Sequence, residues 1–170
     1  MGFVVVSDTG LEDADATANS YASVAFFLTY WADRGFDYSD YDGEAIQANL
    51  VKATDYIERR FKNRFLGQLM SLEQRLSWPR SNVFTREGRT VTEVPTAIRE
   101  ACAEYAARSL LGTALWGDPS VNPNVRKTVT ALGPIRDEVE YVGGGLADSE
   151  FPLADALVSE FVLSSGGVYR

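Results

Sequence analysis

Residues 42–61 read DGEAIQANLVKATDYIERRF, and this stretch decides the fold. Apolar side chains recur in it at every third or fourth position, a spacing that places them on one face of an α-helix. They are Ile46, Leu50, Ala53, Ile57 and Phe61. Asp42 precedes the first of them and is a residue type that caps helix N-termini. The sequence therefore predicts one long helix that buries a single face.

The same spacing predicts three further helices around this one. The first covers residues 24–31, with Ser23 as its N-cap and Gly35 beyond its end. A second begins at Pro95 and is expected to continue to about Trp116, because proline is tolerated in the first turn of a helix. In that helix Glu104 and Arg108 are expected on the solvent-facing side, four residues apart. The last is a short helix that opens at Pro152, with Leu153, Leu157 and Phe161 on its apolar side.

Between the last two helices the pattern changes from a helical period to alternation. Val125, Lys127 and Val129 alternate with polar residues before Gly133 and Pro134, and a second alternating run follows. Two such runs around a turn predict a β-hairpin over about residues 125–142. Residues 67–94 lose the helical period and are expected to form an irregular connection with a short extended piece.

The predicted fold is mainly α: a small helical bundle with a β-hairpin and extended N- and C-terminal arms. A chain of 170 residues and 18.7 kDa is the size of one domain. We expect that domain to cover residues 1–162, including an N-terminal arm at 1–19, and a tail to follow at 163–170. The apolar stretches are shorter than the roughly 20 residues that cross a bilayer, and no secretory signal is visible at the N-terminus. We therefore expect synthesis in a cytoplasm and no membrane partner.

The residue types present argue against catalysis. The chain has no histidine and one cysteine, Cys102, so the commonest general base and metal ligand is missing and no internal disulfide can form. Cys102 lies among alanines at helical spacing and is interpreted as a small buried residue. Residues 40–44 lack most ligands of a calcium loop, and the glycines at 143–145 match no phosphate-binding motif. We expect no enzyme activity, no catalytic residue, no metal and no cofactor.

Charge is unevenly distributed along the chain. The net charge is −8, yet residues 59–89 hold eight basic and two acidic side chains, a local charge of +6 against −14 elsewhere. Basic and aromatic residues together can neutralise phosphates and stack bases, so this segment is a candidate nucleic-acid or neighbour contact. The candidate residues are Arg59, Arg60, Lys62, Arg64 and Arg80. The same residues could instead be solvated surface charge, or could stabilise the C-terminal end of a helix through its dipole.

Several stretches together resemble a known family. They are residues 8–11, 18–23, 30–35, Leu50 with 53–57, 94–95, 133–135 and 139–141, and Gln74-Arg75-Leu76 followed by Trp78-Pro79-Arg80, which is the most specific. Over about residues 6–162 the chain resembles the head-tail connector proteins of tailed bacteriophages, also called adaptor or head-completion proteins and often labelled DnaT-like. Residues 12–17 and 25–27 depart from the usual pattern of that family.

The resemblance implies a structural role in virion assembly. The family forms a homo-oligomeric ring, expected to be a dodecamer, that binds the portal protein in the neck of the virion, extends the DNA channel and joins the capsid to a tail or stopper protein. DNA would pass through without sequence-specific binding. By resemblance, portal binding is expected from the C-terminal end, through Phe161, Leu163, Val168, Tyr169 and Arg170. Subunit or tail-side contacts are expected from the hairpin, at Leu132, Gly133, Pro134 and Ile135.

The DnaT-like label and the basic segment also support a different hypothesis. In it the protein binds single-stranded DNA and acts in replication, with affinity that falls as salt is added. The two hypotheses differ in partner: another protein in the first, a nucleic acid in the second.

Overall fold

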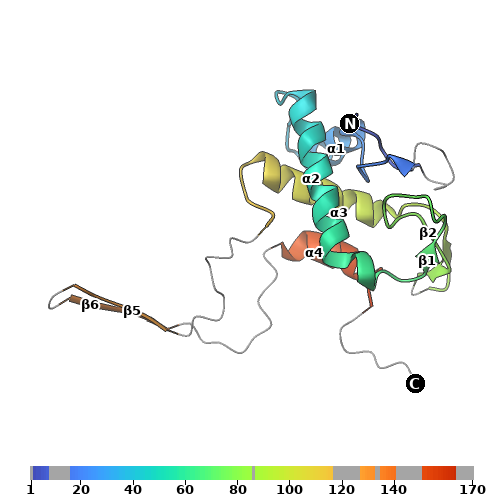
Figure 1. Ribbon diagram of the computed structural model, residues 1–170. Helices are drawn as coiled ribbons and strands as arrows, with labels where there is room; N and C mark the ends of the chain where they lie inside the picture. The colour runs from blue at the N-terminus through green and yellow to red at the C-terminus, as the bar shows by residue number, and fades with distance from the viewer. Residues whose placement is uncertain are drawn as a thin grey trace, which may run out of the picture.

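The computed structural model describes residues 2–7, 16–85, 87–116, 127–132, 135–140 and 151–163. In these ranges the helices are α1 (Val24–Ala32), α2 (Gly43–Phe61), α3 (Thr96–Leu110) and α4 (Pro152–Ser159), with a short 3-10 turn, η2 (Lys62–Arg64), after α2. The three two-stranded antiparallel sheets pair β1 (Gln68–Leu69) with β2 (Arg80–Ser81), β3 (Val83–Phe84) with β4 (Thr90–Val91), and β5 (Lys127–Leu132) with β6 (Ile135–Glu140). Figure 1 shows a mainly helical body, which confirms the predicted fold class.

Helix α3 lies at the centre of the body and packs against α1, α2 and α4. Contact with three helices buries it on nearly every side, so its polar residues do not all reach solvent. Glu104 is 4% exposed and accepts a hydrogen bond of 2.8 Å from the Tyr30 hydroxyl on α1. Arg108 is exposed, as predicted, but the prediction that Glu104 shares that solvent-facing side was wrong, because Glu104 is buried and bonded to α1.

The single cysteine belongs to this core. Cys102 is fully buried, its sulfur lies 3.4 Å from the Thr54 hydroxyl, and it donates a weak hydrogen bond of 3.7 Å to the Leu50 carbonyl. Burial raises the pKa of the Cys102 thiol to about 11. The thiol is therefore protonated and shielded near neutral pH, as expected for a packing residue.

The helix boundaries follow the local signals in two cases and depart from them in a third. Ser23 caps α1, its hydroxyl accepting a 3.1 Å hydrogen bond from the Phe26 amide. Helix α2 begins directly after Asp42, as predicted, although the Asp42 side chain forms no capping hydrogen bond. Helix α3 ends at Leu110 and not near Trp116, because Gly112 adopts φ +89°, a left-handed conformation that stops the helix.

Helix α4 buries a different face from the one predicted. Its buried residues are Ala154 and Val158, in line with buried Phe151 and Phe161 on either side, while Leu153 is 59% exposed. The spacing from 151 to 161 is helical, and it sets the face that meets α3. The predicted apolar side through Leu153 was wrong since periodicity alone cannot choose between two overlapping apolar stripes.

The N-terminal residues are part of the body. Val5 forms a parallel bridge with Ser20, and the Asn19 side chain accepts from the Val4 amide at 2.9 Å and donates to the Gly2 carbonyl at 2.9 Å. Val6 is buried, at 6% exposure. Residues 2–7 therefore pack against residues 18–20, whereas the sequence predicted an extended arm over the whole of 1–19.

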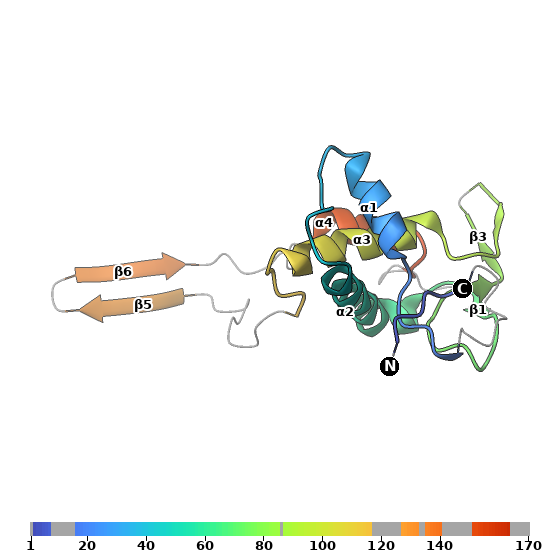
Figure 2. The same ribbon diagram turned by 90° about the horizontal axis from the view of Figure 1, so that it is seen from above.

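The hairpin β5–β6 confirms the predicted change to β structure. Its register pairs Lys127 with Glu140 and Leu132 with Ile135. The views of Figures 1 and 2 both show it apart from the helical body. Within the described residues no helix is long and apolar enough to cross a membrane.

Candidate functional site

The five basic residues singled out in the sequence lie in two different settings. Arg59 and Arg60 belong to the last turn of α2, and Lys62 and Arg64 form the ends of η2. All four are exposed, whereas Arg80 on β2 is 8% exposed. The structure thus brings the first four together at one end of α2 and places Arg80 inside the loop region between α2 and α3.

Arg80 is a structural residue. Its guanidinium donates to the backbone carbonyls of Leu66 at 2.6 Å, Gly67 at 2.9 Å and Ser77 at 3.2 Å. Backbone carbonyls in an irregular loop have no ladder partners, so a buried guanidinium supplies the donors that they need. Burial lowers the pKa of Arg80 from its ordinary value, but a guanidinium stays charged at neutral pH. Arg80 is therefore unavailable to a ligand.

The rest of the Gln-Arg-Leu and Trp-Pro-Arg signature also serves this loop. The Gln74 amide donates to the carbonyls of Leu76 at 2.8 Å and Pro79 at 3.0 Å. Trp78 is fully buried and meets Phe161 edge to face, with ring centroids 5.4 Å apart. The stretch that carries the family resemblance most specifically thus has a structural role: it fixes the conformation of the loop and packs the loop against the residues that follow α4.

Arg60 is engaged by helix α4. Its guanidinium lies 2.6 Å from the Asp155 carboxylate and donates to the Tyr56 hydroxyl. The other oxygen of Asp155 accepts from the Tyr105 hydroxyl, and burial raises the pKa of that tyrosine. The network ties α2, α3 and α4 together, so the charge of Arg60 is largely compensated within the protein.

Arg59 faces outward and covers an aromatic ring that sequence reasoning did not select. Its guanidinium carbon lies 4.7 Å from the centre of the Trp116 ring, and Trp116 is 45% exposed. Such cation–π pairs are common where arginine and tryptophan meet at a surface. The prediction had placed Trp116 at the end of a helix, and no local pattern links it to Arg59, which is 57 positions earlier.

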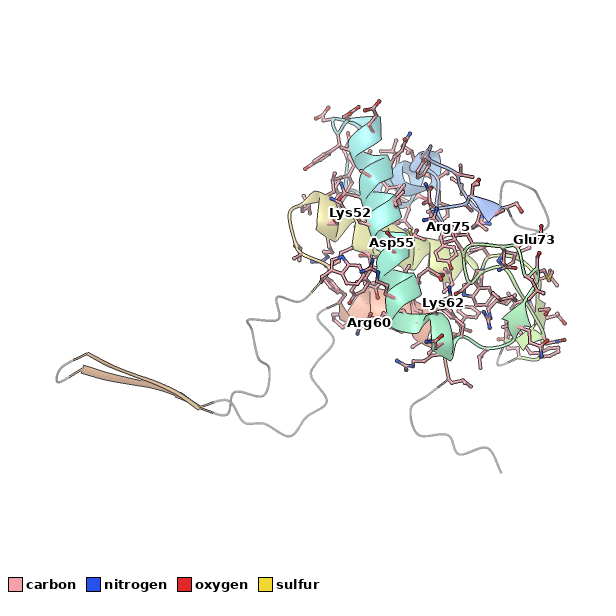
Figure 3. All side chains as sticks on the ribbon, viewed as in Figure 1. Lys52, Asp55, Arg60, Lys62, Glu73 and Arg75 are labelled. Atoms are coloured by element: carbon pink, nitrogen blue, oxygen red, sulfur yellow. The ribbon has the colours of Figure 1, made fainter. Side chains whose placement is uncertain are left out.

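Two lysines extend this surface along α2. Lys52 lies seven residues before Arg59 and Lys62 three residues after it, so the three share one face of the helical rod. Figure 3 shows Lys52, Asp55 and Lys62 arrayed along α2. Asp55 is the acidic member of that face and weakens its positive potential. We call Lys52, Arg59, Lys62, Arg64 and Trp116 the α2 basic surface.

The residues expected to bind a portal protein are split between core and tail. Phe161 is buried at 6%, its carbonyl accepts from the Leu66 amide at 2.9 Å, and it is therefore a core residue. Leu163 is 43% exposed, and its amide donates to the Arg64 carbonyl at 2.8 Å. The other predicted tail contacts, Val168, Tyr169 and Arg170, lie outside the described residues, as do Gly133 and Pro134 of the hairpin turn. Leu132 and Ile135 pair at the turn end of β5–β6.

The described residues hold no group of three or more potential metal ligands. A small pocket is lined by Glu104, Arg108 and residues 151–154 at the junction of α3 and α4. Of these, Glu104 already accepts a hydrogen bond from Tyr30. The α2 basic surface is the better candidate for a binding site, since it combines exposed cations with an exposed aromatic ring.

Comparison with known proteins gives one match. No curated protein matches the chain, and no solved structure does. A family model described as "Putative DnaT-like ssDNA binding protein" matches residues 2–170, which is nearly the whole chain. The chain therefore belongs to the DnaT-like family that this model defines.

Proposed function

We propose that this protein is a non-catalytic binding protein that binds single-stranded DNA through the α2 basic surface, without sequence preference. Membership of the DnaT-like family supports the class of ligand. The observation that carries the proposal is the set of exposed cations beside exposed Trp116 at one end of α2. Phosphates would meet the cations, and released counterions would make the affinity strongly dependent on salt.

The overall charge of −8 limits where DNA can bind. Asp37, Asp40, Asp42 and Glu44 lie at or before the first turn of α2, at the opposite end from Arg59 and Lys62. A helix of 19 residues is roughly 28 Å long, about three and a half Debye lengths at physiological salt. The acidic end is therefore far from the basic end, and DNA is expected to bind at the basic end.

The test is fluorescence anisotropy of a labelled oligo(dT) at increasing salt. The native chain should bind at low ionic strength, and affinity should fall steeply as salt is added. Lys62→Gln should weaken binding, whereas Arg89→Gln, which removes an equal charge from an exposed residue 3.8 Å from Glu87, should not. Absence of salt-dependent binding by the native chain would reject the proposal.

A second candidate function is the head-tail connector role, in a virion neck. The sequence resemblance supports it, and so does the position of hairpin β5–β6 apart from the body, because a projecting hairpin can contact a neighbouring subunit or a tail protein. The acidic and basic ends of α2 are also complementary, so that copies could meet head to tail in a ring. The partners in this role would be the portal protein, a tail or stopper protein and further copies of the chain.

Capture by immobilised portal protein tests this second candidate. The full chain should be retained, and a chain ending at Val162 should be retained less, since it lacks Leu163 and the residues after it. Equal retention of both chains would reject the tail contacts. Failure of the full chain to bind portal protein would reject the connector role.

A further inference from the structure

Trp116 differs from the other two tryptophans in its exposure. Trp31 is 8% exposed and Trp78 is fully buried, whereas Trp116 is 45% exposed. The preceding residue, Leu115, is 4% exposed and anchors the backbone at this point. The ring is therefore accessible to a ligand, and unlike the other exposed apolar side chains that the structure describes it lies against a cation, Arg59.

The ring is held in place from beneath. Tyr56 meets Trp116 edge to face, with centroids 5.4 Å apart and planes at 68°. Tyr56 is itself 6% exposed and packs against Tyr105 at 4.8 Å and Phe151 at 5.9 Å. Trp116 is therefore the outer member of an aromatic cluster that extends into the core. A ring fixed in this way loses little conformational entropy when a ligand stacks on it.

A cation lies over the ring. The guanidinium carbon of Arg59, in the last turn of α2, is 4.7 Å from the ring centre. Lys62, three residues after Arg59 in the chain, is an exposed cation of η2. No hydrogen bond or ion pair holds Arg59 or Lys62 among the described residues, in contrast to Arg60, which Asp155 holds. An exposed aromatic ring at a surface with exposed cations matches a nucleotide, in which a flat base is joined to charged phosphates.

We propose that Trp116 stacks on a nucleobase of single-stranded DNA while Arg59 and Lys62 bind phosphates of the same strand. This inference rests on the proposed function and makes it more specific, since cations alone would bind any polyanion. Every base has a flat aromatic face, so stacking adds affinity without selecting a sequence. The ligand is then a strand with unpaired, accessible bases, and duplex DNA should bind more weakly.

The test compares two strands of equal length and charge, oligo(dT) and an abasic deoxyribose-phosphate oligomer. The native chain should bind oligo(dT) about fivefold to 150-fold more tightly than the abasic strand, the range expected for stacking of one base on an aromatic side chain. Oligo(dT) should also quench the tryptophan fluorescence of the native chain, and the abasic strand should not. Equal affinity for the two strands would overturn the stacking proposal and leave salt-dependent DNA binding intact.

Three variants assign the effect to the ring. Trp116→Leu should lose the preference for oligo(dT) and keep its affinity for the abasic strand, whereas Trp116→Phe should keep part of the preference. Lys62→Gln should weaken binding of both strands by the same factor. A urea titration of each variant checks the fold. If Trp116→Leu lost affinity for both strands equally, Trp116 would be a structural residue and the proposal would fail. If the native chain bound neither strand at low salt, the proposed function would fail with it.

Discussion

The C-terminal end of α2 and the loop that carries Arg80 both contain basic residues, but the structure places Arg59 and Arg80 in opposite settings. Arg59 and Lys62 point into solvent at the helix end, while Arg80 is buried and donates to three loop carbonyls. The backbone explains the difference. A helix satisfies most of its own carbonyls, whereas the loop relies on side chains to do so. A cation is available to a ligand only where the backbone does not need it.

The largest expected effect comes from removing the buried cation. Arg80→Met keeps most of the side-chain volume but leaves the carbonyls of Leu66, Gly67 and Ser77 without their donor. We expect the free energy of unfolding to fall by about 3 to 4 kcal/mol in urea denaturation, since each unsatisfied buried polar group costs roughly 1–3 kcal/mol. Arg64→Met removes only one long, exposed hydrogen bond, of 3.4 Å to the Leu163 carbonyl, and should change the free energy of unfolding by less than about 0.5 kcal/mol. A similar loss of stability in Arg80→Met and Arg64→Met would contradict the distinction between a structural cation in the loop and an exposed cation at the helix end.

The same loop gives the second effect, through its backbone. Gly67 has φ +72°, and a Cβ added there would lie 2.3 Å from the Ser81 carbonyl oxygen. Gly67→Ala should therefore cost about 2 to 3 kcal/mol of unfolding free energy, from strain and displacement of β2. Gly88 has φ +81° with open space around it, so Gly88→Ala introduces backbone strain without a steric clash. It should lower the free energy of unfolding by about 1 kcal/mol. Thermal denaturation of the two variants measures the difference.

Arg60 is intermediate, because it is exposed like its neighbours yet held by Asp155. Replacing either residue by alanine should cost about 1 kcal/mol of stability, since a half-exposed ion pair is screened by water. A double-mutant cycle over Arg60→Ala and Asp155→Ala should give a coupling free energy of the same order. Affinity of Arg60→Ala for oligo(dT) should stay closer to that of the native chain than the affinity of Arg59→Ala does.

The smallest effect on stability is expected at Lys62. Lys62→Gln should leave the urea midpoint unchanged within about 0.5 kcal/mol, because no hydrogen bond or ion pair holds this lysine among the described residues. The slope of log affinity for oligo(dT) against log salt should decrease by about 0.7, the value for one phosphate contact on a single strand. A stability loss as large as that of Arg80→Met would place Lys62 with the structural cations.

Local pattern was enough for the helices that have one clear apolar stripe. Helix α2 buries the residues that the apolar spacing from Ile46 to Phe61 predicts. Helix α1 begins directly after Ser23, the predicted N-cap. The apolar spacing predicted the wrong exposure where α1, α2 and α4 pack around α3. Glu104 is buried because α3 is surrounded, and Leu153 is exposed because α4 turns Ala154 and Val158 inward. Both outcomes depend on tertiary contacts that no window of sequence contains.

The exposed cations of the candidate site were among the residues selected from the sequence. Counting charge selected Arg59, Lys62 and Arg64, which the structure shows to be exposed at the end of a helix. It could not separate Arg80 from them, because the carbonyls that Arg80 satisfies come from chain positions up to 14 residues away. Trp116 was missed for the same reason. It lies after the end of α3, and its partner Arg59 is on α2, so no local pattern connects the two residues.

Helix α3 sets a limit on how this molecule can diverge. Ala101, Ala103, Ala106 and Ala107 are each at most 1% exposed, so methyl groups form part of the buried surface of this helix, which packs against α1, α2 and α4. A longer side chain at any of these four would force a surrounding helix outward and shift every residue on it. Related chains can therefore exchange outward-facing residues to suit new ligands, while the alanine positions tolerate almost no substitution.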